Sequence, residues 1–237
     1  MGGGPSGQHG GAPAGPGAVV SPSRGPSADA RYGLSGEFVD LGAATLGECG
    51  ALPMSPRLKA AWPGAVLAGP AVTVRCAPGD NLAIHVALLE APEDSVLVVD
   101  CSEVPERGYW GEVLATAAMA RGVAGLVIDG GVRDTGALRS LGFPAFSSVL
   151  ALRGATKLAG GEIGGPVEVG DVTVSPGDWV VGDVDGVVVV PGGRLAEVAE
   201  AAHRRAKKEG EMFAALREGS STVELLGLDP SAVKRVS

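Results

Sequence analysis

The distribution of apolar and polar positions predicts helices and strands that alternate along the chain. Apolar residues form short β-branched or continuous runs bounded by glycine, proline or acidic residues, a pattern typical of buried strands. Longer stretches of helical character lie between these runs, and Asp80 or Asn81 is placed to cap one of the helices. We expect strands over 71–76, 95–100, 125–129 and 147–150, and helices over 40–49, 82–91, 112–121 and 135–141. This order indicates an α/β sheet that is covered on both faces.

The second half of the chain has a different pattern, in which short alternating runs are separated by tight turns. The turns at Gly170-Asp171 and Val184-Asp185-Gly186 favour hairpins, so a β-rich part should follow the α/β layers. We expect strands over 166–174, 179–183 and 187–190, then a long helix over 195–217 and a short apolar tail over 223–228 that packs on a neighbouring subunit.

Composition divides the chain into two parts. Residues 1–30 consist mainly of glycine, proline, serine and alanine. Such a segment buries too little apolar surface to offset the entropy lost on ordering, so we expect a disordered tail. The chain as a whole is 45% hydrophobic, which is enough for a substantial core. We therefore assign residues 31–237 to a single domain that ends in the long helix.

Net charge and the lengths of the apolar runs argue against two classes of partner, and the cysteine content indicates a compartment. A net charge of −8 argues against a nucleic-acid partner, which needs a broad basic surface. The basic cluster over 204–208 is interleaved with glutamates and is interpreted as the solvated face of a helix. No run of about 18 apolar residues exists, so no membrane partner is expected. Three cysteines without metal or disulfide spacing favour a reducing compartment, the cytoplasm.

The strongest chemical pattern is Trp110-Gly111-Glu112 followed, after twenty residues, by Arg133-Asp134. A helix that returns to a strand can bring Glu112 and the Arg133-Asp134 pair to one edge of the sheet, beside a glycine turn at Gly130-Gly131. An arginine there presents a planar fork to a carboxylate, and an aspartate can ligate Mg²⁺ or Mn²⁺. The pair could equally be a helix-capping aspartate beside a surface arginine, and Glu112 could serve only the helix dipole.

Other candidate residues carry weaker signals. Asn81 and His85 lie four apart on one helix face, although a single histidine is often structural. The amides of Val113 and Leu114 at a helix start could bind an anion, or only water. No zinc spacing and no serine-hydrolase elbow are present. The glycine-rich stretch 160–165 lacks the lysine of a phosphate loop and is interpreted as a flexible connection.

Four blocks in order resemble one family: Pro78–Asn81, Trp110–Thr116, Gly125–Asp134 and Gly182–Val187. They are similar to the 4-hydroxy-4-methyl-2-oxoglutarate / 4-carboxy-4-hydroxy-2-oxoadipate aldolases, which share their fold with the regulator of ribonuclease E activity. The resemblance covers roughly residues 41–228. It implies a three-layer α/β/β fold like the swivelling phosphohistidine domain, assembled as trimers or dimers of trimers. It also implies a metal-dependent class II pyruvate aldolase that decarboxylates oxaloacetate, a 2-oxo acid.

The resemblance also implies a role for individual residues. Asp134 would ligate Mg²⁺ or Mn²⁺, and Arg133 would bind the pyruvyl carboxylate or the enolate oxygen. Residue 112 would hold a metal-bound water, but it is Glu112 here, where the family's aldolases typically have aspartate. The remaining implied residues are the amides of Gly111, Val113 and Leu114, the polar side chains of Asn81 and His85, the acidic Glu48 near the pocket, and Glu209, which would reach a neighbour's site.

Two alternatives stay open at the level of sequence. The chain could be a non-catalytic regulator that binds ribonuclease E or another protein. It could also be a related lyase that acts on a different 2-oxo acid. The presence of the long C-terminal helix favours the enzyme, because the regulators tend to lack it.

Overall fold

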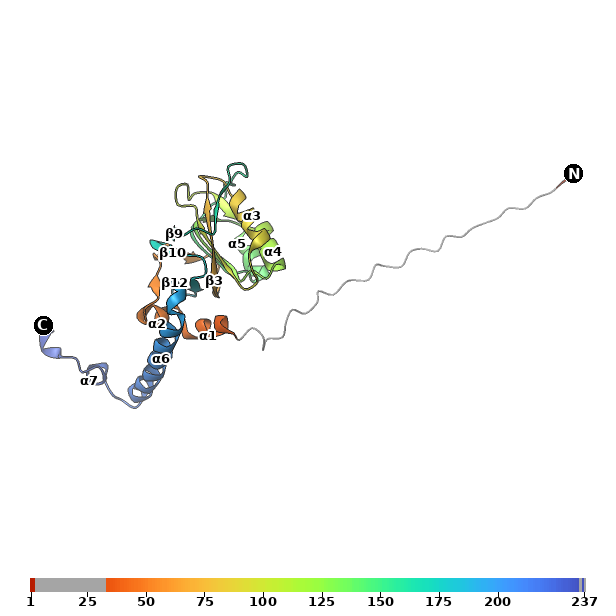
Figure 1. The fold of residues 1–237 in the computed structure, drawn as a ribbon. Coiled ribbons are helices and arrows are strands. Elements are labelled where there is room, and N and C mark those ends of the chain that lie inside the picture. Colours follow the sequence, from red (N-terminus) through yellow and green to blue (C-terminus); the bar gives the residue numbers. More distant parts are fainter. Residues whose placement is uncertain (3–32, 235, 237) are drawn as a thin grey trace.

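The computed structural model describes residues 1–2, 33–234 and 236. The tail predicted for residues 1–30 therefore lies, apart from its first two residues, outside the described part. Figure 1 shows a body built on one curled sheet, with helices α3, α4 and α5 on one side and the β9–β10 hairpin on the other. The chain has a mixed α/β fold, as predicted; the three-layer, phosphohistidine-like arrangement stays a prediction.

The central sheet has ten strands in the order β1-β12-β11-β3-β4-β6-β7-β2, with β5 beside β6 and β8 beside β3. Strands β3, β4, β6 and β7 are parallel to one another, so their C-terminal ends meet at one edge. The strands are β1 (Leu52–Pro53), β2 (Lys59–Ala60), β3 (Leu67–Cys76), β4 (Val96–Asp100), β5 (Gly108–Trp110), β6 (Gly125–Val132), β7 (Ala145–Leu150), β8 (Gly161–Ile163), β11 (Trp179–Gly182) and β12 (Val187–Val190).

Each face of the parallel strands buries its own set of side chains, because successive residues of a strand point to opposite faces. Leu126 and Ile128 of β6 face the core shared with α3 (Leu82–Glu90), α4 (Glu112–Ala120) and α5 (Thr135–Leu141). Val127 faces the other core, which the hairpin of β9 (Val167–Val169) and β10 (Val172–Val174) helps to close. The predicted coverage of both faces is confirmed.

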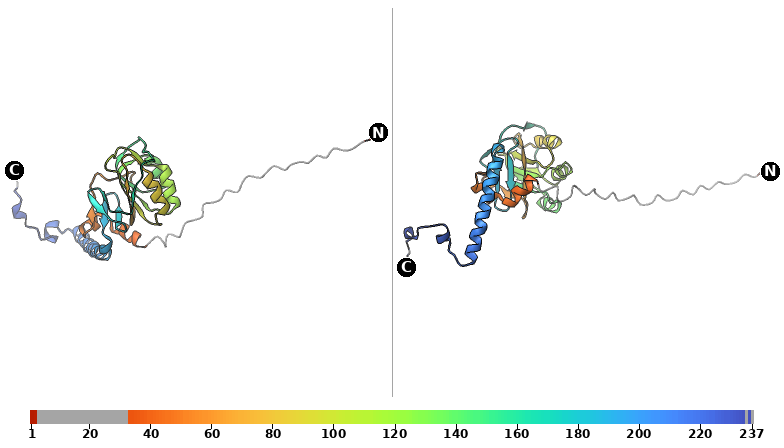
Figure 2. Two further views of the ribbon diagram at one scale, coloured as in Figure 1. Left: turned by 45° about the horizontal axis from the view of Figure 1, so that its top comes forward. Right: turned by 60° about the horizontal axis from the view of Figure 1, so that its bottom comes forward.

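A third cluster of buried residues lies over β11 and β12. Helices α1 (Leu34–Leu41), α2 (Ala43–Glu48) and α6 (Leu195–Arg217) pack there around Phe38, Leu46 and Val198. Only the first turns of α6 are buried, and the rest of the helix projects from the body with α7 (Thr222–Leu225) beyond it, as Figure 2 shows. Within the described residues, no helix is both long enough and apolar enough to cross a membrane.

The structure corrects three local predictions. Gly130-Gly131 is not a turn but part of β6, because β5 and β7 pair on either side of it. The glycine-rich connection is also a strand, since Gly161–Ile163 pairs antiparallel with the end of β3. The helix expected over 40–49 is two helices that break at Gly42, where φ is 76°. The Asp183 carboxylate, from the turn between β11 and β12, accepts a hydrogen bond of 2.7 Å from the Ala43 amide that starts α2.

Candidate functional site

A cavity of about 160 Å³ lies where the C-terminal ends of β3, β5, β6 and β7 come together. Strand ends of this kind are the usual binding position in open α/β sheets. Seven residues predicted from the sequence line this cavity: Asn81, His85, Gly111, Val113, Leu114, Arg133 and Asp134. Trp110, which the sequence motif contains but to which no role was assigned, also lines the cavity, and sequence reasoning missed the other five wall residues: Gly108, Tyr109, Gly154, Ala155 and Lys157.

Arg133 and Asp134 stand at the point where β6 ends and α5 begins. The Arg133 amide donates to the Trp110 carbonyl at 2.9 Å, which fixes the backbone against β5. The Arg133 Nε lies 3.8 Å from Asp134 Oδ2, and both side chains remain nearly half exposed. Asp134 adopts the left-handed conformation with φ 56° and ψ 36°. Aspartate tolerates that region better than most residues, and an unusual backbone angle here is consistent with a functional position.

Gly111 makes room for the aspartate. Its φ of −166° is extended backbone that any residue adopts, so the reason for glycine is space and not conformation. A Cβ at this position would lie 2.4 Å from Asp134 Oδ2 and 3.1 Å from Arg133 Cγ. Gly108, two residues before Trp110, is similarly confined by the Ala151 carbonyl and the Arg133 side chain. The two glycines therefore let β5 pack directly against the charged pair.

Glu112 reaches the site through its backbone. The Glu112 amide, at the start of α4, donates to Asp134 Oδ2 at 3.2 Å. This contact confirms that a helix and a strand bring Glu112 and Asp134 to one edge, as the spacing predicted. The Glu112 side chain is exposed and does not line the cavity. Its role in holding a metal-bound water stays a prediction.

Asn81 and His85 form the opposite wall, at the start of α3. The Asn81 Nδ2 donates to the Tyr109 carbonyl at 2.7 Å, so this buried amide is tied to β5. Burial lowers the pKa of His85, and the nearby Lys157 ammonium lowers it further, which outweighs the opposing effect of Asp80. His85 is therefore neutral at pH 7.

Asp80 is fully buried and ties the loop after β7 to the start of α3. Its Oδ1 accepts from the Leu82 amide at 2.8 Å, while Oδ2 accepts from Thr156 Oγ1 at 2.7 Å and from the amides of Leu158 and Ala159. Burial acts to raise the pKa of Asp80, but these hydrogen bonds prevail and hold the pKa well below its usual range. The sequence pointed to Asp80 or Asn81 as a helix cap, and the cap bond belongs to Asp80.

Lys157 shows what the sequence could not reveal. It lies on the loop that Asp80 holds, within the cavity wall, and no local motif marks it as functional. Trp110 was visible next to Gly111, but nothing in the sequence showed that its indole would turn into the core. In the structure Trp110 is completely buried and stacks on Phe143 with ring centroids 5.4 Å apart.

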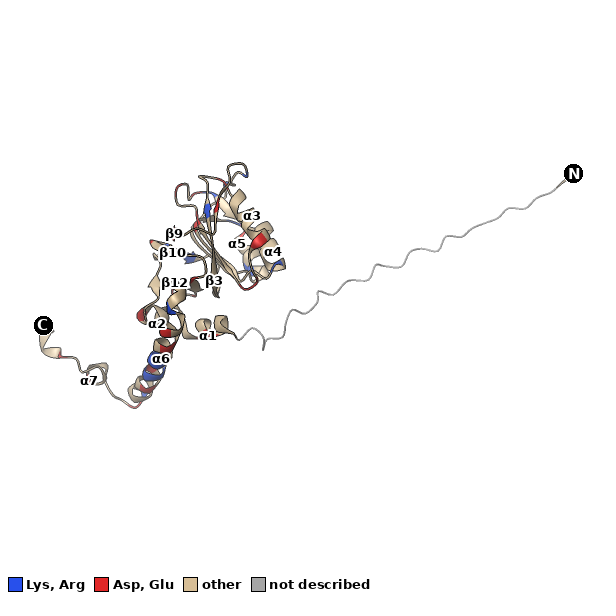
Figure 3. Cartoon of the chain, in the orientation of Figure 1, with Lys and Arg blue, Asp and Glu red and all other residues tan. Residues whose placement is uncertain are grey.

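Glu48 and Glu209 lie elsewhere in this chain. Both pair with Arg205, Glu209 at 2.9 Å, where α2 packs against α6, and neither lines the cavity. Figure 3 shows acidic and basic residues along the length of α6, and the ion pairs of Arg204 and Arg205 agree with the solvated helix face predicted for 204–208. The neighbour-subunit role of Glu209 concerns an assembly and stays a prediction.

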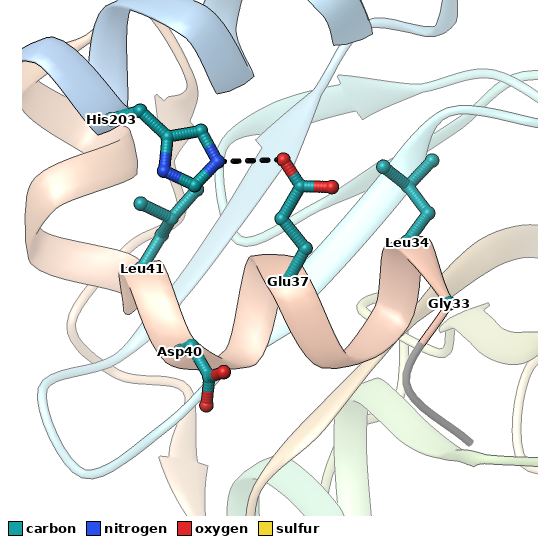
Figure 4. A pocket seen from close by; sticks show the side chains of 6 residues that line it. All are labelled: Gly33, Leu34, Glu37, Asp40, Leu41 and His203. Carbon is teal, nitrogen blue, oxygen red and sulfur yellow. Dashed lines mark hydrogen bonds and ion pairs between the residues drawn. The ribbon is translucent and has the colours of Figure 1, made fainter. Parts of the chain in front are cut away.

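A wider hollow of about 720 Å³ lies between α1 and α6, but the polar side chains that line it are a poor set for binding or catalysis. As Figure 4 shows, His203 of α6 points to Glu37 of α1 and Asp40 points away from both. The His203 Nε2 and Glu37 Oε1 are 2.8 Å apart, so each already satisfies the other. None of the sequence-predicted site residues lies there, and the cavity at the strand ends is the better candidate.

The cavity offers one carboxylate for a cation. Among the described residues, no cluster of three or more histidine, cysteine, aspartate or glutamate side chains is arranged to hold a metal. Mg²⁺ and Mn²⁺ do not require one, because they commonly bind through one or two carboxylates and take water and substrate oxygens for the rest. The half-exposed Asp134 carboxylate fits that requirement, and a site of this kind would be completed by the substrate.

Comparison with known proteins finds relatives in sequence and in fold. A Halalkalibacterium halodurans protein named "Putative 4-hydroxy-4-methyl-2-oxoglutarate aldolase" is 39% identical over 137 residues, 58% of this chain, and the match spans 65% of that protein. The crystal structure of an uncharacterized protein from Pseudomonas syringae superposes with a TM-score of 0.72 at 27% sequence identity, and the match covers 85% of this chain and 98% of that protein's chain. Streptomyces coelicolor RraAS2, described as an unusual member of the RNase ES inhibitor RraA family, is 27% identical with a TM-score of 0.66 over 82% of this chain and 99% of its own.

The family assignment rests on a match that contains the whole cavity. Residues 38–189 match the RraA-like family, described as Aldolase/RraA, and every residue of the cavity wall falls within that range. The chain belongs to the RraA-like family.

Proposed function

We propose that the protein is a divalent-metal-dependent lyase that cleaves 4-hydroxy-2-oxo acids of the 4-hydroxy-4-methyl-2-oxoglutarate type to pyruvate, and that also decarboxylates oxaloacetate. The observation that carries this proposal is the contact of Arg133 and the Glu112 amide with one half-exposed aspartate, Asp134, at the strand ends. The family assignment and the named aldolase relative support a carbon–carbon lyase.

Both proposed reactions form the same anionic intermediate. Cleavage of the C3–C4 bond, or loss of CO₂ from oxaloacetate, leaves a pyruvate enolate. The Arg133 guanidinium can form two parallel hydrogen bonds with a carboxylate or can lie against the enolate oxygen. The amides of Val113 and Leu114, at the start of α4, add donors beside it. Such fixed donors stabilise the negative charge without reorganising during the reaction.

Asp134 would ligate Mg²⁺ or Mn²⁺. The Glu112 carboxylate would hold a water molecule bound to that cation. When bound, the cation supplies Lewis-acid polarisation of the 2-oxo group and lowers the pKa of its water. Asp134 keeps its position because the Glu112 amide donates to it and because Gly111 leaves space for its carboxylate.

The test is pyruvate release from oxaloacetate with and without Mg²⁺ or Mn²⁺, in the wild type and in Asp134→Asn. Asparagine keeps the shape of the side chain and tolerates the left-handed backbone, but it removes the charge that a cation needs. We expect metal-dependent turnover in the wild type and its loss in the variant. Full activity of Asp134→Asn would refute the metal assignment.

A second function is favoured by the similarity to RraAS2, which is described within a family of RNase ES inhibitors. The protein would then be a non-catalytic regulator that binds an RNA-processing enzyme. This alternative predicts a stable complex with a ribonuclease E-type protein and no turnover with either metal. Lyase activity without complex formation would exclude it.

We also infer that the chain assembles as a trimer or a dimer of trimers. Support comes from the projecting C-terminal arm, on which Phe213 and Leu226 are each about half exposed. Apolar side chains of this kind commonly mark contacts between subunits. Sedimentation equilibrium of the full chain measures the assembly directly, and a monomer at micromolar concentration would refute it.

A further inference from the structure

One of the two positively charged side chains that line the cavity has no acidic partner. These side chains are Arg133 and Lys157. Arg133 Nε lies 3.8 Å from the Asp134 carboxylate. Among the described residues, the ion pairs do not include Lys157. Because His85 is neutral, the cavity wall carries one more positive charge than negative charge.

The backbone on both sides of Lys157 is anchored. The buried Asp80 carboxylate accepts hydrogen bonds from the Thr156 hydroxyl and from the Leu158 and Ala159 amides. Thr156 also exchanges two backbone hydrogen bonds of 2.9 Å with the segment before α3. Lys157 therefore leaves the chain from a fixed position, and a ligand that binds its ammonium group has little backbone entropy to remove.

The Lys157 ammonium lies near other groups of the cavity wall. Its charge helps to lower the pKa of His85, which places it close to that imidazole ring. Arg133 borders the same loop, since a Cβ at Gly154 would lie 3.7 Å from Arg133 Nη1. Gly154 and Lys157 are three residues apart, and three residues of chain span at most about 11 Å. One small ligand can therefore reach both cations.

A carboxylate is the ligand group that suits this lysine. An ammonium group donates three hydrogen bonds and accepts none. A hydroxyl or carbonyl oxygen would accept one of these bonds but would leave the positive charge unbalanced. A carboxylate supplies both the acceptor oxygens and the counter-charge. Arg133 is already assigned to the pyruvyl end of the substrate, so the carboxylate at Lys157 is a second one.

We propose that Lys157 binds the second carboxylate of a dicarboxylic 2-oxo acid, the one remote from the pyruvyl end, so that the site selects diacids over monoacids. This inference rests on the proposed lyase function and assigns the recognition of its substrate's remote charge to one side chain. Lys157 holds this carboxylate by charge and hydrogen bonds, with no bond made or broken by it. Asp80 is a positioning residue, because it fixes the loop from which Lys157 extends.

The test compares two substrates that differ only at C5. 4-Hydroxy-2-oxoglutarate has a carboxylate there and 4-hydroxy-2-oxopentanoate has a methyl group, while cleavage of the C3–C4 bond releases pyruvate from both. We would measure kcat/KM with Mg²⁺ at pH 8 in the wild type, Lys157→Met and Lys157→Arg. At this pH His85 is neutral with or without Lys157, because the usual pKa of histidine is about 6.5. Lys59→Met is the matched control, since Lys59 is exposed on β2 and does not line the cavity.

We expect Lys157→Met to lower kcat/KM for the diacid by about tenfold and to leave that for the monoacid within about twofold. The loss is smaller than for a buried ion pair because the Lys157 side chain is exposed. Lys157→Arg should keep most of the preference for the diacid, and Lys59→Met all of it. An equal loss on both substrates, or an unchanged ratio in Lys157→Met, overturns the role of Lys157. A wild type without a preference for the diacid overturns it as well.

Binding of unreactive analogues separates this inference from the proposed function. 2-Oxoglutarate and 2-oxopentanoate differ at C5 in the same way, and both lack the C4 hydroxyl that cleavage needs. Isothermal titration calorimetry with Mg²⁺ should show that the wild type binds the diacid about tenfold more tightly and that Lys157→Met binds the two about equally. A wild type inactive on both hydroxy acids refutes the proposed cleavage reaction. In that case a Lys157-dependent preference for 2-oxoglutarate still supports the carboxylate subsite, and its absence overturns the subsite too.

Discussion

Asp80 provides the sharpest test of how the site is held together. Its carboxylate accepts hydrogen bonds from the Leu82, Leu158 and Ala159 amides and from the Thr156 hydroxyl. These bonds join the start of α3, which carries Asn81, to the loop that carries Lys157. We therefore expect replacement of Asp80 to weaken both the fold and the cavity wall.

The size of the effect follows from the number of donors that lose an acceptor. In Asp80→Ala, the carboxylate's four donors lose their partner, and each buried donor left unpaired costs about 1–3 kcal/mol. Because the loop is only partly buried, water can replace some of these bonds, and we expect a loss of about 3 kcal/mol. Asp80→Asn keeps one acceptor and should lose about 1–2 kcal/mol. Thr156→Val removes one hydroxyl donor, which Asp80 shares with the Gly79 carbonyl, and should lose about 1 kcal/mol.

The assay is urea unfolding at several pH values. The pKa of Asp80 is depressed in the folded protein. The stability that the carboxylate contributes is therefore complete above the pKa of an unfolded aspartate, about 3.9, and is lost as the pH falls toward the folded value. The difference between wild type and Asp80→Asn should be full at pH 7 and should shrink below about pH 4. A difference that stays constant from pH 7 to pH 3 would refute the role of the charge.

Three further predictions concern single contacts, each with a measurement. Gly111→Ala should lower lyase activity about a hundredfold by displacing Asp134, whereas Gly136→Ala, which meets no atom within 4 Å, should be active; equal activities would contradict the steric argument. Arg57→Ala should lower the free energy of unfolding by about 2 kcal/mol because it leaves the buried Asp129 without its cation. Asp171→Asn removes only the charge of the exposed partner, keeps a residue that tolerates the φ of 65° at this position, and should cost under about 0.5 kcal/mol. Lys157→Met should raise the pKa of His85 toward its usual value in an NMR titration, because an adjacent positive charge disfavours the imidazolium; a lower pKa would show that Lys157 does not face His85.

The regular parts of the fold could be predicted because their signals are local. The helix over Thr135–Leu141 and the strand pair β11 and β12 were visible in the apolar pattern and in the turn residues between them. The strands at the site were harder to predict. Gly130-Gly131 has the composition of a turn, and only pairing with β5 and β7, which depends on distant parts of the chain, makes it a strand. Likewise, Gly161 lies so close to β3 that a Cβ there would be 2.3 Å from the Arg75 carbonyl oxygen, and the residues next to Gly161 in the sequence do not indicate this pairing.

The same distinction applies to the site. Residues close in sequence to the charged pair were found, because a helix start and a strand end share one edge of the sheet in any fold of this class. Lys157 was missed because it reaches the cavity through the Asp80 carboxylate, a contact that spans more than seventy residues of chain. Buried hydrogen bonds of this length leave no trace in local composition.

These long contacts suggest that one half of the site determines the chemistry and the other half determines substrate preference. The half around Arg133 and Asp134 depends on glycines that let strands approach, so its geometry belongs to the sheet and should tolerate change elsewhere. The half around Asn81, His85 and Lys157 depends on one buried carboxylate that holds a loop. A loop can change its side chains without disturbing the sheet. Substrate preference should therefore vary through the residues after β7, while the chemistry at the end of β6 stays the same.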